Sequence, residues 1–286
     1  MPEQPPSFIT KWGSRGTEDG QFFHPGAVAV DSYGNVYVVD QLNNRIQKFD
    51  PDGTFIIKWG SRGQGDGQFD FPTGVALDSS DNVYVADANN NRIQKFDPDG
   101  TFIIKWGGRG EGDGQFQEGK TGVAVDSFDN VYVADSNNTR IQKFDPDGTF
   151  TTKWGSFGVG DGQFDFPTGV ALDSSNKVYV ADLGNRRIQK FDSDGTFITK
   201  WGSFGVGDGQ FISHSGVAVD SFDNIYVADT FNHRIQKFDR DGIFITKWGS
   251  QGERDGQFTH PQGAALDSSG NVYVADGSNN RIQKFG

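Results

Sequence analysis

Short runs of alternating apolar and polar residues, separated by polar turns, recur along the whole chain. In residues 69–107 four such runs follow one another: TGVALD, NVYVAD, NRIQKFD and GTFIIKWG. Ser, Asp, Asn and Gly, which favour turns, separate them. Runs of this length and composition predict four antiparallel strands in each unit. In the fourth strand of the preceding unit, residues 22–60, Phe55, Ile57 and Trp59 are expected on one face.

This unit repeats six times. All six tryptophans occur in KWG, and the pentapeptide RIQKF begins every 47 or 48 residues, at Arg45, Arg92, Arg140, Arg187, Arg234 and Arg281. One extra residue stands in the third unit, between Phe116 and Gly122, where a loop is expected and an insertion is tolerated. Four strands repeated radially at this period predict an all-β fold, a six-bladed β-propeller.

The two ends of the chain each carry part of a unit. Residues 7–12 have the pattern of a fourth strand, whereas the last residues, RIQKFG, have that of a third strand. We expect the N-terminal outer strand to complete the C-terminal blade, which leaves no open edge in the ring. Residues 1–5 carry no strand pattern and are expected to be dispensable. The chain is then a single domain, 1–286, with blades at 22–60, 69–107, 116–155, 164–202, 211–249, and 258–286 plus 7–12.

These motifs resemble the NHL-repeat family over essentially the entire chain. The recurring patterns are Pro-x-Gly-Val-Ala-x-Asp, Val-Tyr-Val-Ala-Asp, Asn-x-Arg-Ile-Gln-Lys-Phe and Phe-x-x-x-Trp-Gly, and the marks of WD40 and kelch propellers are missing. The resemblance implies several roles: many NHL propellers dock proteins, some bind RNA on a basic top face, some are sensor domains of bacterial kinases, and a related amidating lyase is a metal enzyme. It therefore indicates the architecture and not the activity.

Composition and charge narrow the classes of partner. The chain has 40 glycines, no cysteine and a formal net charge of −12. Nucleic acid and anionic membrane are not expected as partners, because phosphate binding needs clustered Lys and Arg. No segment has the pattern of a signal peptide or a membrane span, which leaves localisation open. We expect a monomer.

Two sets of aspartates recur in every unit. The first set stands five residues before the RIQKF arginine, as Asp87 does before Arg92, and is expected to brace the hairpin between the second and third strands. The second set is expected to cap the turn after the first strand by accepting backbone N–H bonds. Its alternative role is a ring of carboxylates that attracts a hard cation at one mouth of the channel. The second set comprises Asp31, Asp78, Asp126, Asp173, Asp220 and Asp267.

Positions that differ between units are the better candidates for function, because a purely structural role would be the same in every blade. Most fall in the loops between blades and in the turns joining second and third strands, which share one face, here called the top. The other turns form the bottom. Arg and Phe carry much of the binding energy at interfaces. The candidate ligand-binding residues are Arg15, Arg62, Arg109, Phe157, Phe204, Gln251, His24, Phe71, Phe166, His214, His260, Arg186, Phe231 and His233. Neutral drift of loops after duplication is the alternative.

Catalytic chemistry is not indicated by any motif. The four histidines map to the top of three consecutive blades, and imidazoles that converge there are suitable Zn²⁺ ligands. No serine elbow or phosphate-binding loop accompanies them. RNA binding is not expected, since Glu18, Asp19, Asp66 and Asp113 offset the arginines of the same loops.

We therefore expect a non-catalytic scaffold that binds a protein or peptide on its top face and at the channel mouth, without catalytic residues, metal or cofactor. Two alternatives are a metal-dependent lyase or hydrolase with a histidine site at the channel mouth, and a repeat protein designed or trimmed without a ligand.

Overall fold

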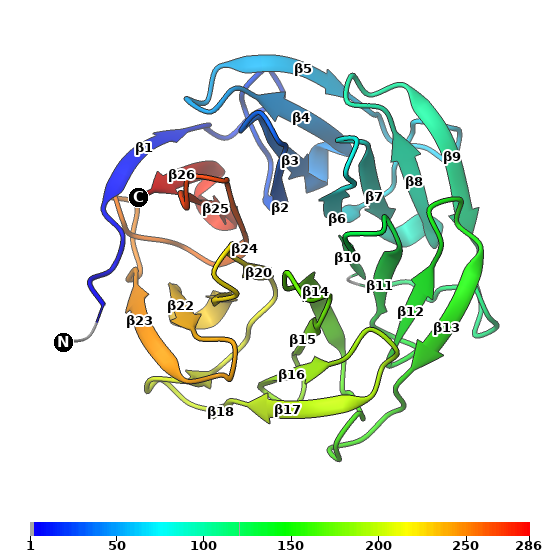
Figure 1. Ribbon diagram of the computed structural model, residues 1–286. Helices are drawn as coiled ribbons and strands as arrows, with labels where there is room; N and C mark the ends of the chain where they lie inside the picture. The colour runs from blue at the N-terminus through cyan, green and yellow to red at the C-terminus, as the bar shows by residue number, and fades with distance from the viewer. Residues whose placement is uncertain (1–2, 120) are drawn as a thin grey trace.

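A computed structural model describes residues 3–119 and 121–286. Six four-stranded antiparallel sheets stand radially around a central axis, as the blades of a propeller (Figure 1). The predicted fold class is confirmed. No helix in this part of the chain has the length and apolar character needed to span a membrane.

Each blade runs from an inner to an outer strand. The first three blades are β2 (Pro25–Val30), β3 (Val36–Asp40), β4 (Arg45–Phe49) and β5 (Phe55–Trp59); β6 (Pro72–Leu77), β7 (Val83–Asp87), β8 (Arg92–Phe96) and β9 (Phe102–Gly107); and β10 (Thr121–Val125), β11 (Val131–Asp135), β12 (Arg140–Phe144) and β13 (Phe150–Trp154). The fourth and fifth are β14 (Pro167–Leu172), β15 (Val178–Asp182), β16 (Arg187–Phe191) and β17 (Phe197–Trp201); and β20 (Val217–Val219), β21 (Ile225–Asp229), β22 (Arg234–Phe238) and β23 (Phe244–Trp248). Between these two lie the short parallel strands β18 (Ser203–Phe204) and β19 (Gln210–Phe211). The described helices are single 3-10 turns at hairpin tips: η1 (Gln41–Asn43), η2 (Ala88–Asn90), η3 (Thr230–Asn232) and η4 (Gly277–Asn279).

The sixth blade is made from both ends of the chain. It contains β24 (Pro261–Leu266), β25 (Val272–Asp276), β26 (Arg281–Phe285) and, as its outer strand, β1 (Phe8–Trp12). Phe8 pairs with Phe285 and Trp12 with Ile282, and β1 lies beside β26 in Figure 1. The predicted closure of the ring is confirmed.

Apolar side chains between neighbouring blades form the core, in six separate clusters. Between the first and second blades, Val39 and Ile46 meet Val83 and Phe96. Trp59 covers this cluster, with its ring 5.9 Å from that of Phe96 in the next blade. Each such buried side chain stabilises the fold by roughly 1.5–3 kcal/mol, so the blades hold one another in place.

The outer strands face both neighbouring blades, and the expectation that Phe55 and Trp59 share a face is wrong. The register of β4 and β5 shifts between Lys48 and Phe49, which marks a β-bulge. Past the bulge, Phe55 packs on Phe49, in the cluster shared with the sixth blade. Trp59 packs toward the second blade. One outer strand therefore covers two different cores.

Candidate functional site

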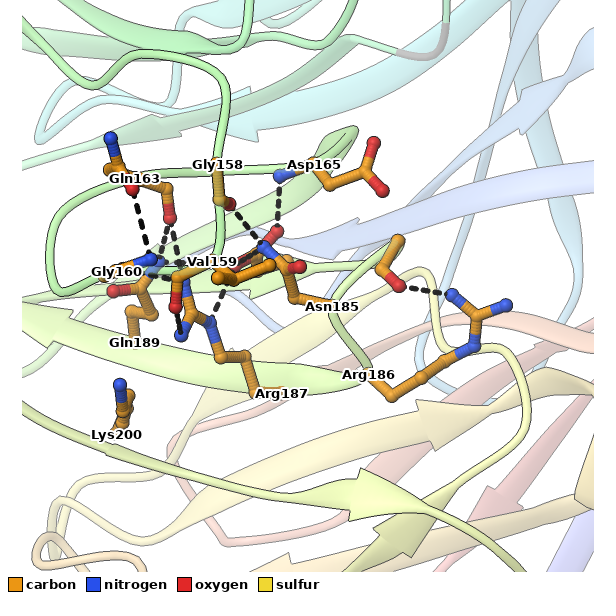
Figure 2. A network of polar contacts seen from close by, with 12 residues as sticks. Gly158, Val159, Gly160, Gln163, Asp165, Asn185, Arg186, Arg187, Gln189 and Lys200 are labelled. Atoms are coloured by element: carbon orange, nitrogen blue, oxygen red, sulfur yellow. Dashed lines mark hydrogen bonds and ion pairs between the residues drawn. The ribbon is translucent and has the colours of Figure 1, made fainter.

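A buried ion pair fixes the top of every blade. In the fourth blade, the Asp182 carboxylate accepts a hydrogen bond of 2.7 Å from Nε of Arg187, and the Asp182 side chain is fully buried. The same pair occurs in all six blades, which confirms the predicted brace. The guanidinium also donates to three carbonyls of the preceding loop, on Val159, Gly160 and Gln163 (Figure 2). The brace therefore fixes the interblade loop as well as the hairpin.

Further side chains complete this network. Nε2 of Gln189 donates to the carbonyl of Gln163 at 2.7 Å, and Nδ2 of Asn185 donates to the carbonyl of Gly158 at 2.8 Å (Figure 2). Burial raises the pKa of Asp182, whereas the hydrogen bonds from Asn185, from the backbone of Asp165 and from Arg187 act in the opposite direction. The interblade loops are thus held in one conformation before any ligand arrives.

The six candidate residues of these loops are all exposed: Arg15, Arg62, Arg109, Phe157, Phe204 and Gln251. The three arginines have local partners. The guanidinium of Arg15 lies 4.9 Å from the ring centroid of Phe23, Arg62 is 4.0 Å from Asp70, and Arg109 is 3.6 Å from Glu118. Their charge is therefore partly satisfied within the loops.

Two valines extend the exposed apolar surface, and they were not among the sequence candidates. Phe157 and Phe204 are 72% and 69% exposed, and Val159 and Val206, two residues further on, are 76% and 67% exposed. These four residues are named the apolar rim. Comparison of the repeats could have indicated these valines, because the other four interblade loops have polar residues at the same position: Thr17, Gln64, Glu111 and Glu253.

A surface groove lies beside one end of the apolar rim, in the irregular third blade. It is lined by Glu111, Gln117, Asn137, Asn138, Thr139, Arg140, Lys153, Trp154, Gly155, Ser156 and Phe157. The single insertion of the repeat falls in the adjoining loop, whose Lys120 lies outside the described residues. Phe157 thus belongs both to the groove and to the apolar rim.

The candidates before each inner strand have a structural role. His24, Phe71, Phe166 and His260 all have φ between 55° and 61°, a left-handed conformation that is uncommon outside glycine. In three of them the backbone N–H group bonds a side chain of the preceding blade: His24 N donates to Asn280 Oδ1 at 2.9 Å, Phe71 N to Asn44 Oδ1 at 2.8 Å, and His260 N to His233 Nδ1 at 3.2 Å. Variation at these positions therefore does not by itself indicate a ligand.

Of the candidates at the hairpin tips, His233 takes part in this linkage, whereas Arg186 donates to the carbonyl of Leu183 in its own tip. Arg186 and His233 also have positive φ, of 57° and 54°. Nδ1 of His233 accepts a hydrogen bond of 3.2 Å from the backbone of His260, and the two rings lie 4.8 Å apart. Phe231 is 55% exposed and lies edge-on to His260. The tips of the fifth blade and the start of the sixth thus form a joined polar and aromatic surface.

His214, which was predicted to lie on the top surface, is buried in the structure. Its side chain is fully buried, stacks on Phe211, and its Nε2 lies 2.9 Å from the carbonyl of Arg187. Burial lowers the pKa of His214 to about 4, so the imidazole is neutral at physiological pH. His214 takes the position that proline fills in four blades and packs as a core residue there.

His233 and His260 lie together, but the four histidines do not gather at one site. His24 lies 3.1 Å from Gln41 Oε1 and His260 3.1 Å from Ser278 Oγ, through Nδ1 in both cases. In residues 3–119 and 121–286, no three His, Asp or Glu side chains are grouped as a metal site. The geometry therefore gives no support to the predicted alternative of a histidine-bound metal.

The capping aspartates are committed to their own turns, as predicted. Asp78 accepts hydrogen bonds from the backbone and side chain of Asn82 and from Tyr84 Oη, and its carboxylate lies 3.0 Å from Lys95 Nζ. Although burial opposes ionisation, the hydrogen bonds from Asn82 and Lys95 hold the pKa of Asp78 below its ordinary value. These oxygens are occupied by protein donors, which argues against the cation ring.

The central channel is narrow. A cavity of about 100 Å³ is lined by the inner strands, among them Val75, Val123 and Val170. Hydroxyl groups at its mouth tie the blades together: Thr73 Oγ1 donates to the carbonyl of Thr121 at 2.9 Å, and Ser215 Oγ to that of Gln262 at 2.7 Å. Pockets that hold drug-sized ligands usually have volumes of about 300–1,000 Å³, so this cavity is smaller than most of them.

Comparison with known proteins identifies the repeat. The NHL repeat family matches five segments, at residues 69–96, 121–144, 164–191, 215–238 and 258–285. Protein wech of Drosophila melanogaster is 46% identical over 43 residues, and lin-41 of Caenorhabditis elegans is 44% identical over 45 residues. These stretches cover 15% and 16% of this chain but only 5% and 4% of those proteins.

Similar solved structures cover nearly the whole chain at low identity. A protein of unknown function from Bacteroides thetaiotaomicron has a TM-score of 0.76 and 19% identity over 99% of this chain and 76% of its own. A gluconolactonase from Xanthomonas campestris has a TM-score of 0.69 and 15% identity, covering 100% and 96%. A streptogramin B lyase has a TM-score of 0.67 and 14% identity, covering 97% and 96%. At these identities the likeness is one of fold.

Proposed function

Because the chain belongs to the NHL-repeat family of six-bladed β-propellers, we propose that it is a non-catalytic scaffold that binds a protein or peptide on its top face. The observation that carries the proposal is the apolar rim. Phe157, Val159, Phe204 and Val206 are each at least two-thirds exposed, on the loops that flank the fourth blade. Their exposure leaves apolar area that a partner removes from water.

The rim has the properties of a prepared interface. Aromatic side chains supply much of the energy at protein interfaces, and a surface that is already ordered loses less entropy on binding. Arg187 anchors the first of these loops through Val159, and Arg234 anchors the second through the carbonyl of Val206 at 2.8 Å. Each valine backbone is thus held rigidly while its side chain stays exposed.

The choice of a protein partner rests on charge and chemistry. The described top loops mix arginines with carboxylates, as in the pairs Arg62–Asp70 and Arg109–Glu118, and do not form the basic stripe that nucleic acid requires. The non-catalytic assignment is supported by the narrow channel and by the internal partners of the histidines and capping aspartates. The likeness to a lyase and a gluconolactonase, at 14% and 15% identity, shows the fold alone.

Selection from a random peptide library displayed on phage tests the proposal. Peptides that bind the immobilised protein are measured by titration calorimetry against the wild type and against the F157S/F204S variant. We expect their affinity to fall about tenfold or more in that variant, as for the loss of interface anchors. Both side chains are exposed, so the variant is expected to keep its melting temperature.

A matched control removes exposed apolar residues elsewhere. The I103S/I198S variant changes two outer-strand residues that are 48% and 45% exposed. Its affinity for the selected peptides should equal that of the wild type. The proposal is wrong if the selected peptides bind F157S/F204S as tightly as the wild type, or if only the outer-strand variant weakens binding.

A further inference from the structure

Three exposed aromatic residues stand on the bottom face, in the turns that join first and second strands. Tyr33, Phe128 and Phe222 are 81%, 74% and 77% exposed, among the most exposed large side chains of the described chain. They belong to the first, third and fifth blades, so they alternate around the ring. This face is separate from the top face of the proposed function, because these turns lie at the opposite ends of the strands.

The fold does not require aromatic residues at these positions. The backbone N–H of Phe128 donates to the capping carboxylate of Asp126 at 2.9 Å. At the equivalent position of the second blade, Ser80 makes the same bond to Asp78 at 3.0 Å. The second, fourth and sixth blades carry exposed Ser80, Ser175 and Ser269 there. Serine therefore completes the turn, and the aromatic rings contribute nothing to it that serine lacks.

The bottom face is also strongly acidic. The turns joining third and fourth strands hold ten aspartates: Asp50, Asp52, Asp97, Asp99, Asp145, Asp147, Asp192, Asp194, Asp239 and Asp241. The turns joining first and second strands add three beyond the capping set: Asp81, Asp129 and Asp223. Only Arg240 and Lys177 oppose them within these turns. Four of the six third-strand lysines form ion pairs with the capping aspartates: Lys48, Lys95, Lys143 and Lys190. Most of the net negative charge of the protein therefore lies on this face.

The protein's own lysines show how an aromatic ring and a carboxylate hold a cation here. Lys95 Nζ lies 4.8 Å from the ring centroid of Tyr84 and 3.0 Å from the carboxylate of Asp78. A cation over an aromatic face is attracted by the ring, and a nearby carboxylate adds to the attraction. Tyr33, Phe128 and Phe222 present such rings to solvent within an acidic surface.

We propose that the bottom face binds a basic segment of a partner protein, rich in arginine and lysine, with Tyr33, Phe128 and Phe222 as its aromatic contacts. The guanidinium groups stack on the three rings, and the exposed Asp52, Asp99, Asp147, Asp194 and Asp241 neutralise them. Charge complementarity selects this partner over an acidic or neutral one.

Binding of a fluorescent oligoarginine peptide, followed by anisotropy in low-salt buffer, tests the proposal. The Y33S/F128S/F222S variant places in three blades the residue that the other three already have. It is therefore expected to fold with an unchanged melting temperature. It leaves the formal charge unchanged, so a loss of affinity measures the rings themselves. We expect this variant to bind the peptide about tenfold or more weakly than the wild type.

Two further variants complete the test. The top-face variant F157S/F204S should bind oligoarginine like the wild type, which separates this proposal from the proposed function. The D52N/D99N/D147N variant should also bind more weakly, and its difference from the wild type should shrink as salt is added. Equal affinity of the wild type and the triple-serine variant would overturn the proposal, because charge alone would then explain the binding. Loss of binding in the top-face variant would overturn it as well.

Discussion

Glu3 of the N-terminal segment accepts a hydrogen bond of 2.6 Å from Nζ of Lys237 in the fifth blade. In other blades the equivalent lysine reaches a turn carbonyl of the following blade, as Lys190 does to Arg240 and Lys284 to Pro51, each at 3.0 Å. The sixth blade has no such turn, because its third and fourth strands come from opposite ends of the chain. Glu3 thus takes the place of the turn, a contact that the absence of a strand pattern in this segment did not indicate.

Removal of residues 1–12 should destabilise the protein far more than removal of residues 1–5. The longer deletion takes away β1, whose Phe8 and Trp12 cover the cores on opposite sides of the sixth blade. Full burial of an aromatic side chain contributes roughly 1.5–3 kcal/mol, so even these two partly buried rings supply a large share of a typical domain's stability. The shorter deletion removes the Glu3 contact, which is half exposed, and should cost about 1 kcal/mol or less.

Melting temperature and aggregation state of the two truncated proteins check this. The E3Q variant serves as a control that removes the charge of Glu3 and leaves the chain length unchanged. Equal melting temperatures for the two truncations would show that β1 does not close the ring in solution.

Replacement of Gly122 by alanine should destabilise the ring at the channel. A Cβ at this position would stand 2.3 Å from the carbonyl oxygen of Thr168 in the next blade, and backbone atoms cannot easily retreat. Overpacking of this kind costs about 1–3 kcal/mol. Gly26→Ala is the matched control, because its Cβ would meet Gln41 at an ordinary 3.6 Å. Thermal unfolding should show a lower melting temperature for G122A only, and a similar decrease in both variants would contradict the steric explanation.

Loss of the Asp182–Arg187 ion pair should lower the free energy of unfolding strongly, even though the top of the blade is near solvent. In D182A the guanidinium of Arg187, whose side chain is only 8% exposed, loses its carboxylate partner. Removing one member of a buried pair costs about 3–5 kcal/mol. D161A breaks the exposed pair with Lys200 on the same blade and should cost no more than about 1 kcal/mol. Urea unfolding measures the free energy of unfolding of both variants. Equal values for D182A and D161A would show that the brace contributes no more than the exposed pair.

Protonation of His214 should destabilise the fold in mild acid. Its pKa falls from an ordinary 6.5 to about 4 because the ring is buried. Between these two values the unfolded chain binds a proton that the folded chain does not, so stability decreases as the pH falls through this window. By pH 4 the loss is about 3 kcal/mol.

The H214P variant has at position 214 the proline that four other blades have there, and it therefore lacks the titrating imidazole. Its free energy of unfolding should therefore depend less on pH between 6.5 and 4 than that of the wild type. The His214 ring should also titrate near pH 4 by NMR, and titration near 6.5 would contradict its burial.

Much of the fold was predictable because each local pattern occurs six times. The Asp182–Arg187 brace and the Asp78 cap followed from spacing within one repeat, since the interactions that they make are local to a hairpin or a turn. The faces of the outer strand did not follow, because strict alternation cannot anticipate the bulge that separates Phe55 from Trp59. Variation between repeats indicated the top loops, whereas Tyr33, Phe128 and Phe222, which alternate with serine, were not among the predicted site residues.

The sequence by itself determined the number of blades, the strands of each blade and the pairing of the two chain ends. Periodic apolar positions and turn residues are short-range features that the chain carries in full. Only the tertiary structure decided that His214 is buried and that Glu3 contacts Lys237. Exposure and contacts of this kind depend on how neighbouring blades approach one another. That approach is set by packing between residues far apart in the sequence, which no single repeat records.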